Sequence, residues 1–329
     1  MKAAWQCGLV LPLLFLTAAA AAAEERPTGP IAGEAWNVPL AENTSLPLAW
    51  IPPGAFTLGS PATEPGRKAD EGPATQVTLS RGFWLGRTLV TIGQWKKVMG
   101  VDIREHLVKR INDDTLHELH GKKQTLRALM GWSRDADPAT YLANEDENLP
   151  MYFISWNDAM GFARELNERE RAAGRLPAGY EYTLPTEAQW ENACRAGSTD
   201  ATHAGPVSAA VLDRIAWYDQ NSARGYEGRR LGASRSGPRE VGQKEPNAWG
   251  LFDMSGNVWQ WCRDWYGPYP GGNVTDPQGP LNGTARVNRG GSFGSGANSM
   301  RSACRASNPQ AEASAYRGFR LALSPEKLR

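Results

Sequence analysis

From Asn247 to the end of the chain, short aromatic and apolar segments alternate with glycine-rich turns. Glycine adopts backbone angles closed to other residues and proline lacks an amide hydrogen, so both interrupt regular structure. The whole chain carries 35 Gly and 23 Pro together with 13 Trp. This combination predicts a loop-rich fold in which aromatic packing, rather than long helices, holds the turns.

The charge balance bears on the class of partner. Thirty-six Lys and Arg oppose 35 Asp and Glu, a formal net charge of +1 at pH 7. Binding to phosphate backbones requires a surplus of positive charge, so we do not expect nucleic acid as the main partner. Hydrophobic residues make up 41% of the 329 residues, which is enough for the core of one large domain or two small ones.

The first 23 residues have the layout of a secretory signal peptide. Lys2 gives a positive start, an apolar run extends from Leu9 to Ala23, and Ala21-Ala22-Ala23 offers a small-residue cleavage site. A membrane anchor is the alternative, but the run is short for a bilayer and acidic residues follow it directly. We therefore predict a cleaved signal peptide over residues 1–23, no stable membrane insertion and a periplasmic location.

Export determines the redox state expected of the cysteines. The mature chain would keep Cys194, Cys262 and Cys304. In an oxidising compartment two of the three are expected to pair, and all three possible pairings stay open from the residues alone.

The rest of the chain divides by composition. Residues 24–47 are rich in Ala, Pro and small polar residues and are expected to form a flexible lead-in. A single domain over residues 48–329 follows, which opens with two short strands around Pro52-Pro53-Gly54 and continues with strands at 77–79 and 83–85. Residues 102–148 are polar and are interpreted as a helical insertion, and residues 199–246 are expected to be mostly loop.

Three helix starts share one pattern. In each, a hydroxyl stands three residues before a polar acceptor: Thr91 before Gln94, Ser155 before Asp158, and Thr186 before Gln189. This spacing lets both side chains satisfy amides that a helix leaves unbonded at its N-terminus. After Ser155, the residues Trp156, Ala159, Met160, Ala163 and Leu166 recur at helical spacing and are expected to face the core.

The histidines offer a weak metal-binding pattern. His117 and His120 could share an ion if they lay on a helix, but no third ligand with a familiar spacing completes a site. We therefore expect His106, His117, His120 and His203 to be surface residues.

Four sequence blocks carry a resemblance to a known family. They are Gly54-Ala-Phe56-Thr-Leu58-Gly59 with Val90-Thr91; Leu184-Pro185-Thr186-Glu187-Ala188-Gln189-Trp190-Glu191 with Cys194-Arg195-Ala-Gly197; Asn247 to Trp261; and Arg289-Gly290-Gly291-Ser292-Phe293 with Arg301-Ser302-Ala303 and Gly318-Phe319-Arg320. Their order and spacing resemble the sulfatase-modifying, formylglycine-generating enzyme (FGE) family over about residues 48–323. The resemblance implies an α+β, C-type-lectin-like fold with much irregular structure.

Charged residues within these blocks are expected to be structural. A charge buried in a protein must be paired, whether or not it takes part in chemistry. Candidates for buried ion pairs that tie distant segments together are Glu187, Arg289, Arg301 and Arg320.

The third block also resembles a calcium site of the family. Calcium takes roughly six to eight oxygen ligands. By the resemblance, Asp253 and Gln260 would give side-chain or backbone oxygens, and Gly256 and Val258 would give backbone carbonyls. A second family site would begin at Asn221 and Ser222, although its later half, near residues 233–235, contains no carboxylate. Calcium is therefore the expected cofactor, with the second site weaker.

The resemblance also identifies what is missing. Catalytic members bind copper through two cysteines, and a thiolate pair suits Cu(I). Ser295 and Met300 occupy those two positions. A serine hydroxyl is a poor copper ligand at neutral pH and a lone thioether is a weak one, so we expect neither copper nor a catalytic residue.

One structural disulfide follows from the resemblance. Cys194 matches a family cysteine whose partner position is Ser302, and Cys304 stands two residues further along. Positions two apart on a strand face the same side. The resemblance therefore implies a Cys194–Cys304 bridge and leaves Cys262 buried.

These features together imply an exported, non-catalytic binding or regulatory protein. The chain resembles the TagR-type subgroup of periplasmic accessory proteins, which are associated with a membrane Thr kinase that controls type VI secretion. The expected partner is the periplasmic sensor domain of such a kinase, bound in a groove lined by Ser295, Asn298, Met300, Trp259 and Trp261. Two alternatives stay open: an oxidase-like enzyme of siderophore chromophore maturation, and a lectin-like ligand-display protein whose variable segment spans residues 289–320.

Overall fold

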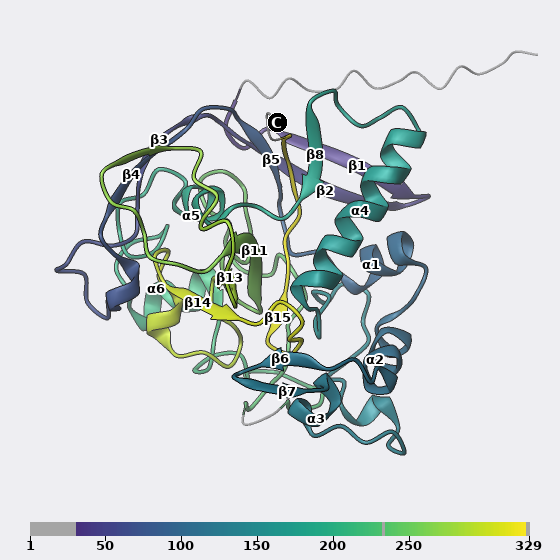
Figure 1. The fold of residues 1–329 in the computed structure, drawn as a ribbon. Helices are drawn as coiled ribbons and strands as arrows, with labels where there is room; N and C mark the ends of the chain where they lie inside the picture. The colour runs from purple at the N-terminus through teal and green to yellow at the C-terminus, as the bar shows by residue number, and fades with distance from the viewer. Residues whose placement is uncertain (1–30, 232–233, 327–329) are drawn as a thin grey trace, which may run out of the picture.

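The computed structural model describes residues 31–231 and 234–326 (Figure 1). The predicted signal peptide, residues 1–23, lies outside this range. Within it, small sheets and short helices are joined by long loops, as the glycine and proline content predicts. None of the helices in the described range combines the length and the apolar character needed to cross a membrane.

A five-stranded antiparallel sheet brings the beginning and the end of the domain together. Its order is β1-β2-β5-β16-β8. The strands are β1 (Ala35–Ala41), β2 (Thr44–Ile51), β5 (Phe83–Gly86), β16 (Ala322–Pro325) and β8 (Tyr180–Thr183). The flexible lead-in predicted for residues 24–47 is therefore wrong from residue 35 onward, because Val38, Leu40 and Leu46 alternate with more exposed residues and pack into the core.

The remaining strands form four smaller sheets. A four-stranded sheet has the order β14-β13-β11-β15, and a three-stranded sheet has the order β12-β4-β3. Their strands are β14 (Arg305–Asn308), β13 (Arg286–Arg289), β11 (Trp259–Trp265), β15 (Arg317–Gly318), β12 (Asn273–Thr275), β4 (Thr75–Leu79) and β3 (Gly54–Leu58). The two-stranded sheets pair β9 (Ala216–Trp217) with β10 (Ser255–Gly256) and β6 (His117–Leu119) with β7 (Lys122–Gln124).

Sequence analysis located these early strands but not their partners. The predicted strands on either side of Pro52-Pro53-Gly54 are β2 and β3, yet they belong to different sheets. The strands predicted at 77–79 and 83–85 are β4 and β5, and these two strands also belong to different sheets. The chain thus crosses between two sheets each time it passes this region.

The three predicted helix starts are confirmed. Capping boxes begin α1 (Ile92–Met99) at Thr91, α4 (Trp156–Ala172) at Ser155, and α5 (Glu187–Arg195) at Thr186. In each box both reciprocal hydrogen bonds form, including the one made by the shorter Asp158. Helix α4 buries Ala159, Ala163 and Leu166 as expected, whereas Trp156 and Met160 are only half-buried.

Residues 102–148 form a separate group of elements, at the lower end of the molecule in Figure 1. They comprise α2 (Ile103–Asn112), the β6–β7 hairpin, α3 (Leu126–Met130) and the short 3-10 helix η2 (Pro138–Thr140). The helical interpretation is right for α2 and α3 but misses the hairpin, which turns at His120 and Gly121 with positive φ angles. Helix α2 packs Ile103, Leu107 and Ile111 against the main core.

Three further helices lie in segments expected to be loops. They are the 3-10 helix η1 (Ala69–Glu71), the helix α6 (Ala209–Ile215) and the 3-10 helix η3 (Ala297–Met300). The described residues of the segment 199–246 are mostly loop, as expected, and α6 is a helix within it: Leu212 and Ile215 are buried and give it a small core of its own.

The surface location expected for all four histidines is wrong for His106, and His203 is half-buried. His106 is buried, with Nε2 3.2 Å from Phe153 O, and burial lowers its pKa to about 3. Burial also lowers the pKa of His203 to about 4. His117 and His120 lie on and after β6 rather than on a helix, and His120 Nε2 is 2.7 Å from Glu312 Oε2. In the described range no three His, Cys, Asp or Glu side chains are grouped as metal ligands.

Candidate functional site

The segment that replaces the copper site begins directly after β13. Gly290 and Gly291 have φ angles of 94° and 75°, a region that favours glycine. A Cβ on Gly291 would lie 2.2 Å from the terminal methyl group of Met300, which would have to move, and 3.0 Å from the Ser299 carbonyl oxygen. The chain then passes through Ser295 into η3 and reaches Met300. The two copper-ligand positions are thereby held in one compact loop.

Ser295 is fixed by hydrogen bonds within that loop. The Ser292 amide donates to Ser295 Oγ at 3.1 Å, and the two hydroxyls lie 2.9 Å apart. The Asp219 amide donates to the Ser295 carbonyl at 3.1 Å. Ser295 is half-buried and is therefore a polar contact point whose hydroxyl already has partners.

Met300 is not a groove residue. Its side chain is only 1% exposed and packs with Leu212, Ile215 and Tyr218 beside α6. A thioether enclosed in this way cannot reach a ligand in solution. The prediction that Met300 lines a binding groove is therefore wrong, because α6 covers this side chain.

The other predicted groove residues differ in their exposure. Trp261 is fully buried and donates from Nε1 to Ile154 O at 2.8 Å, so its role is in the core. Trp259 is half-buried on β11, and its amide donates to Tyr316 O. Only Asn298 is exposed, next to Gly66. None of the five predicted groove residues lines any of four cavities in the described part of the chain.

The three described cysteines are free thiols, so the expected Cys194–Cys304 bridge is absent. Cys194 Sγ instead lies 3.5 Å from Ser302 Oγ. Residues 301–304 form a turn closed by a hydrogen bond from the Cys304 amide to Arg301 O, so the side alternation of a strand does not apply there. Burial raises the pKa of all three thiols, which makes them poor nucleophiles.

The predicted calcium loop is largely satisfied by protein donors. Gln260 Oε1 accepts from Trp190 Nε1 at 2.8 Å and from Arg320 Nε at 3.0 Å, which leaves it no free lone pair for an ion. Gln260 Nε2 donates to the Asp253 carbonyl at 2.8 Å. The Gln260 side chain therefore does not fit as a calcium ligand, and its main-chain oxygen stays a predicted one. Asp253, Gly256 and Val258 stay predicted ligands.

Asp253 itself is a buried carboxylate. It accepts from the Gly242 amide at 2.8 Å, and burial raises its pKa despite that bond and the nearby positive charge of Arg320. The Arg320 guanidinium donates to Phe252 O at 2.5 Å and also to Gly86 O. Arg320 was expected in an ion pair, but its hydrogen bonds go mainly to carbonyl oxygens. Its positive charge acts on Asp253 without a hydrogen bond between the two side chains.

The second calcium position is occupied by an arginine. Arg239 donates to the backbone carbonyls of Ser222, Arg224 and Gly225. Its guanidinium also stacks on Trp217 and Tyr226, with ring-centroid distances of 4.7 and 5.0 Å. The side chains of Asn221 and Ser222 donate hydrogen bonds to the main-chain oxygens of Ala216 and Phe293, respectively. This site does not fit calcium, because a cationic side chain already holds its oxygens.

The expected buried ion pairs are confirmed for three of the four residues. Arg289 Nη1 lies 2.7 Å from Glu187 Oε1, and Arg301 Nη2 lies 2.5 Å from Glu71 Oε1. Burial alone would raise the pKa of Glu187, but the charges of Arg305 and Arg289 outweigh it and lower the pKa. These pairs connect α5 and η1 to the C-terminal segments.

Sequence analysis missed several members of this network. They are Glu71, Glu191, Arg195 and Arg305. Glu191 and Arg195 stand four apart, which brings them together on α5 and was readable from the spacing. Asp264 was also missed: it accepts from the Glu187 amide at 2.9 Å, and burial next to the Glu187 charge raises its pKa to about 7.

Comparisons with known proteins agree with this architecture. The family model described as a sulfatase-modifying factor enzyme 1-like domain matches residues 38–325. The formylglycine-generating enzyme of Streptomyces coelicolor is 31% identical over 302 residues, which covers 83% of this chain and 87% of that protein. The serine/threonine-protein kinase pkn1 of Chlamydia pneumoniae is 32% identical over 178 residues, which covers 53% of this chain and 24% of the kinase.

A solved structure extends the likeness to three dimensions. Treponema denticola variable protein 1 superposes with a TM-score of 0.63 at 23% identity, covering 88% of this chain and 99% of that chain. At this identity the likeness shows the fold alone. The family match begins at residue 38, inside β1, which agrees with the ordered start of the domain seen in the structure. The chain therefore belongs to the sulfatase-modifying factor enzyme 1-like (FGE-sulfatase) family and has its α+β fold.

Proposed function

We propose that this chain is an exported, non-catalytic binding protein that acts in the periplasm. There it promotes activation of a membrane Thr kinase that controls type VI secretion. The observation that carries the proposal is the chemistry at the two copper positions. Ser295 offers a hydroxyl bonded to Ser292, and Met300 offers a thioether enclosed beside α6. Neither group provides the thiolate that binds Cu(I).

The other sulfur atoms do not compensate for this loss. Cys194, Cys262 and Cys304 are each fully or almost fully buried. Burial raises the pKa of each thiol, so the thiolate that copper binding and redox chemistry need is disfavoured. A fold kept without its reactive groups supports a role in binding rather than in catalysis.

The kinase part of the proposal has separate support. A protein named as a serine/threonine kinase contains a region similar to this chain, over about a quarter of its length. Domains that are fused in one protein often act together when they are separate chains, and this favours a kinase partner. The periplasmic location rests on the signal-peptide layout of residues 1–23.

The first experiment tests the absence of catalysis. The purified mature chain is loaded with Cu(I) and incubated with oxygen and a cysteine peptide of the sulfatase type, and mass spectrometry follows loss of the thiol. The Streptomyces coelicolor relative serves as the active control. We expect no conversion and no tight copper. Conversion of the peptide at a rate near that of the control would end the non-catalytic assignment.

The second experiment tests the partner. Calorimetry measures binding of the mature chain to the purified periplasmic domain of a membrane Thr kinase from the same genome. We expect binding that Asn298→Arg weakens, because this exposed side chain stands three residues after Ser295 in the same loop. Leu281→Ser, at a side chain 99% exposed, is the matched control and should bind normally. An unaffected Asn298→Arg variant contradicts binding at this loop.

The two alternatives predict other outcomes of the same work. An oxidase-like enzyme of siderophore maturation would purify with, or convert, a chromophore precursor. A lectin-like display protein would bind a small ligand through residues 289–320 and ignore the kinase domain. If the kinase domain does not bind and one of these two results is obtained, the corresponding alternative replaces the proposed function.

A further inference from the structure

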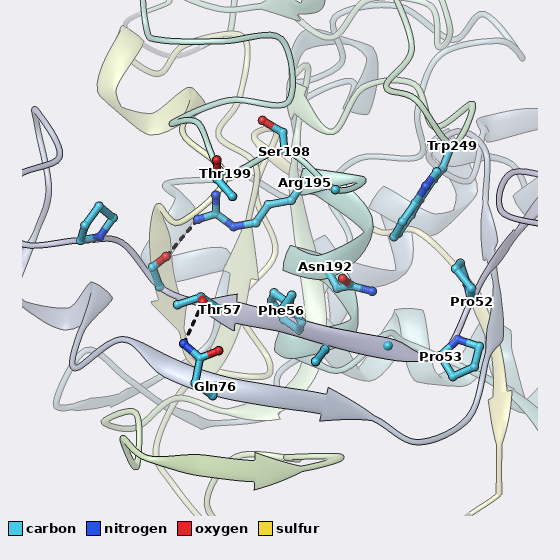
Figure 2. A pocket seen from close by; sticks show the side chains of 15 residues that line it. Pro52, Pro53, Phe56, Thr57, Gln76, Asn192, Arg195, Ser198, Thr199 and Trp249 are labelled. Atoms are coloured by element: carbon cyan, nitrogen blue, oxygen red, sulfur yellow. Dashed lines mark hydrogen bonds between the residues drawn. The ribbon is translucent and has the colours of Figure 1, made fainter.

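A cavity of about 600 Å³ lies along β3, on the side that faces the C-terminal end of α5 (Figure 2). Its apolar walls come from Pro52, Pro53, Phe56, Pro61 and Trp249. Polar groups enter from Asn192 and Arg195 on α5 and from the loop that follows. This cavity contains none of the residues from the Ser295 loop, so it is a separate feature of the molecule.

Strand β3 is an edge strand of its sheet. It pairs with β4 alone, in the order β12-β4-β3. Natural edge strands are commonly protected from pairing by charged residues or an inward-pointing charge. The five residues of β3, Gly-Ala-Phe-Thr-Leu, include no charged side chain. The cavity therefore borders an edge that lacks this common protection.

The pairing pattern shows which main-chain groups lie on that edge. The Gln76 amide donates to Gly272 O at 2.8 Å, and Thr78 O accepts from the Asp276 amide at 2.9 Å, so both residues direct their groups toward the β12 side. Because such groups alternate along a strand, Thr75, Val77 and Leu79 face β3. Their partners there are Leu58, Phe56 and Gly54.

Ala55 and Thr57 must then direct their amides and carbonyls away from β4. No main-chain partner for these outward groups exists among residues 31–231 and 234–326. Both residues line the cavity and are exposed. The edge of β3 thus presents two donors and two acceptors to the cavity.

The next outward position shows how such an edge is satisfied. The Gly59 amide donates to Glu191 Oε1 at 3.0 Å, and Arg195 Nη2 donates to Gly59 O at 2.9 Å. Two side chains of α5 therefore take the place of one residue of a neighbouring strand. They close the edge at this end, and the open part extends from Thr57 toward Pro52.

Asn192 faces the open part of the edge from α5 (Figure 2). Its carboxamide forms no hydrogen bond with any residue in the described range, although the side chain is only 8% exposed. A carboxamide can donate and accept at once, as a peptide main chain requires. Asn192 and β3 therefore provide polar groups on two sides of the cavity.

The charge at the closed end favours an acidic occupant. Arg195 is the one ionisable residue in the cavity wall. Its guanidinium pairs with Glu191 and also donates to Gly59 O and Asp200 O. Among the described residues no acidic side chain lines the cavity, so Arg195 is the charged group that an occupant would meet there.

We propose that β3 and α5 form a docking site for an extended C-terminal peptide of a partner protein, which adds as a strand to the free edge of β3. An apolar side chain of the peptide would contact Phe56 and Trp249, and its terminal carboxylate would lie near Arg195. Asn192 would bond the far side of the peptide main chain. This inference concerns a different surface and holds whether or not the proposed function does.

The test uses a displayed library of random heptapeptides with free C-termini, selected on the mature full-length chain. The discriminating variant is Ala55→Pro, which removes one outward amide while the ladder to β4 keeps its bonds. Ala55→Ser is the matched control, since it keeps that amide. Enriched peptides are synthesised with free and with amidated C-termini, and their affinities are measured by fluorescence anisotropy.

We expect the selected peptides to bind about tenfold more weakly to Ala55→Pro and unchanged to Ala55→Ser. Asn192→Ala and C-terminal amidation should each weaken binding several-fold. Amide resonances of residues 54–57 should shift on binding. Failure to enrich any peptide on the wild-type chain over Ala55→Pro overturns the proposal, as do shifts confined to other regions.

One other occupant has its own signature. A second copy of this chain could pair edge to edge through β3. Sedimentation would then find a dimer in the wild-type chain that Ala55→Pro dissociates, and this result would assign the edge to self-association instead of to a partner peptide. A folded monomer for both Ala55 variants, checked by circular dichroism, is the outcome that the docking proposal expects.

Discussion

Arg301 Nη2 lies 2.5 Å from Glu71 Oε1, and neither side chain is exposed to solvent although 230 residues separate the two in the chain. Arg301 also donates to Glu64, Gly66 O and Asn298 O, so all of its N–H groups have partners. This residue ties the loop before β4 to the segment that replaces the copper site. The loop around Ser295 is therefore held in place by Arg301, which belongs to the fourth sequence block that carries the family resemblance.

Removal of one member of this pair should destabilise the fold strongly. We expect Glu71→Gln to lower the free energy of unfolding by about 3 kcal/mol, because Glu71 bonds both ends of the buried Arg301 guanidinium and only Glu64 then remains to pair with that charge. Urea unfolding followed by tryptophan fluorescence measures the change. Glu245→Gln, in the exposed pair with Arg214, is the control and should change the free energy of unfolding far less, because solvent screens this pair. Equal losses for the two variants would contradict a buried pair.

Asp264 should make the fold less stable as the pH rises. Its pKa is raised to about 7, from an ordinary value of 3.8, first by burial and then by the Glu187 charge. Between these two values the folded chain binds more protons than the unfolded chain, so the free energy of unfolding falls as the pH rises and levels off above about 7.

Asp264→Asn should remove this slope while it keeps an acceptor for the Glu187 amide. Relative to the wild type, the variant should gain up to about 4 kcal/mol between pH 4 and pH 8. Urea titrations at several pH values measure the difference. Asp135→Asn, at an exposed position, is the control and should follow the wild-type curve. A wild-type slope that persists in Asp264→Asn would assign it to another group.

The cysteines should be unreactive in the native chain. Cys194, Cys262 and Cys304 are buried free thiols, and burial raises the pKa of each. We expect no reaction with a thiol reagent near neutral pH until denaturant is added, and then three equivalents per mature chain. One equivalent without reductant, and three with it, would instead establish a disulfide. Cys304→Ser identifies whether that residue takes part.

Calcium can be tested through thermal stability. A ligand that binds the folded chain raises its melting temperature, so chelation should lower the melting temperature if Asp253, Gly256 and Val258 hold the ion. Asp253→Asn should abolish the response to added calcium. Ser222→Ala is a control at the position where Arg239 already occupies the carbonyl oxygens, and it should respond as the wild type does. A melting temperature that changes with neither chelator nor added calcium excludes the Asp253 loop as a calcium site.

The parts of this fold that could be predicted from the sequence depend on short spacings. Thr91, Ser155 and Thr186 begin helices because the hydrogen bonds that cap a helix join residues three apart. The absence of a copper thiolate pair is equally readable, since Ser295 and Met300 are fixed in the sequence itself. Family membership followed from four such local blocks in order.

Other features depend on which segments the fold brings together. The sequence could not show that α6 covers Met300, that Arg239 fills the second calcium position, or that residues 301–304 form a turn that leaves Cys194 facing Ser302. Each of these results from contacts between distant residues. Local residue spacing does not predict these contacts, because side-chain packing and strand pairing form only when the whole chain folds.

The candidate docking edge also depends on contacts between distant segments. The residues of β3 could be read as a strand from the sequence, and so could those of β4. Only the tertiary structure decides that β3 pairs on one side alone and directs Ala55 and Thr57 toward a cavity bordered by Asn192. A strand's own residues specify its alternation, whereas its neighbours, which lie far away in the chain, determine whether its edge stays open.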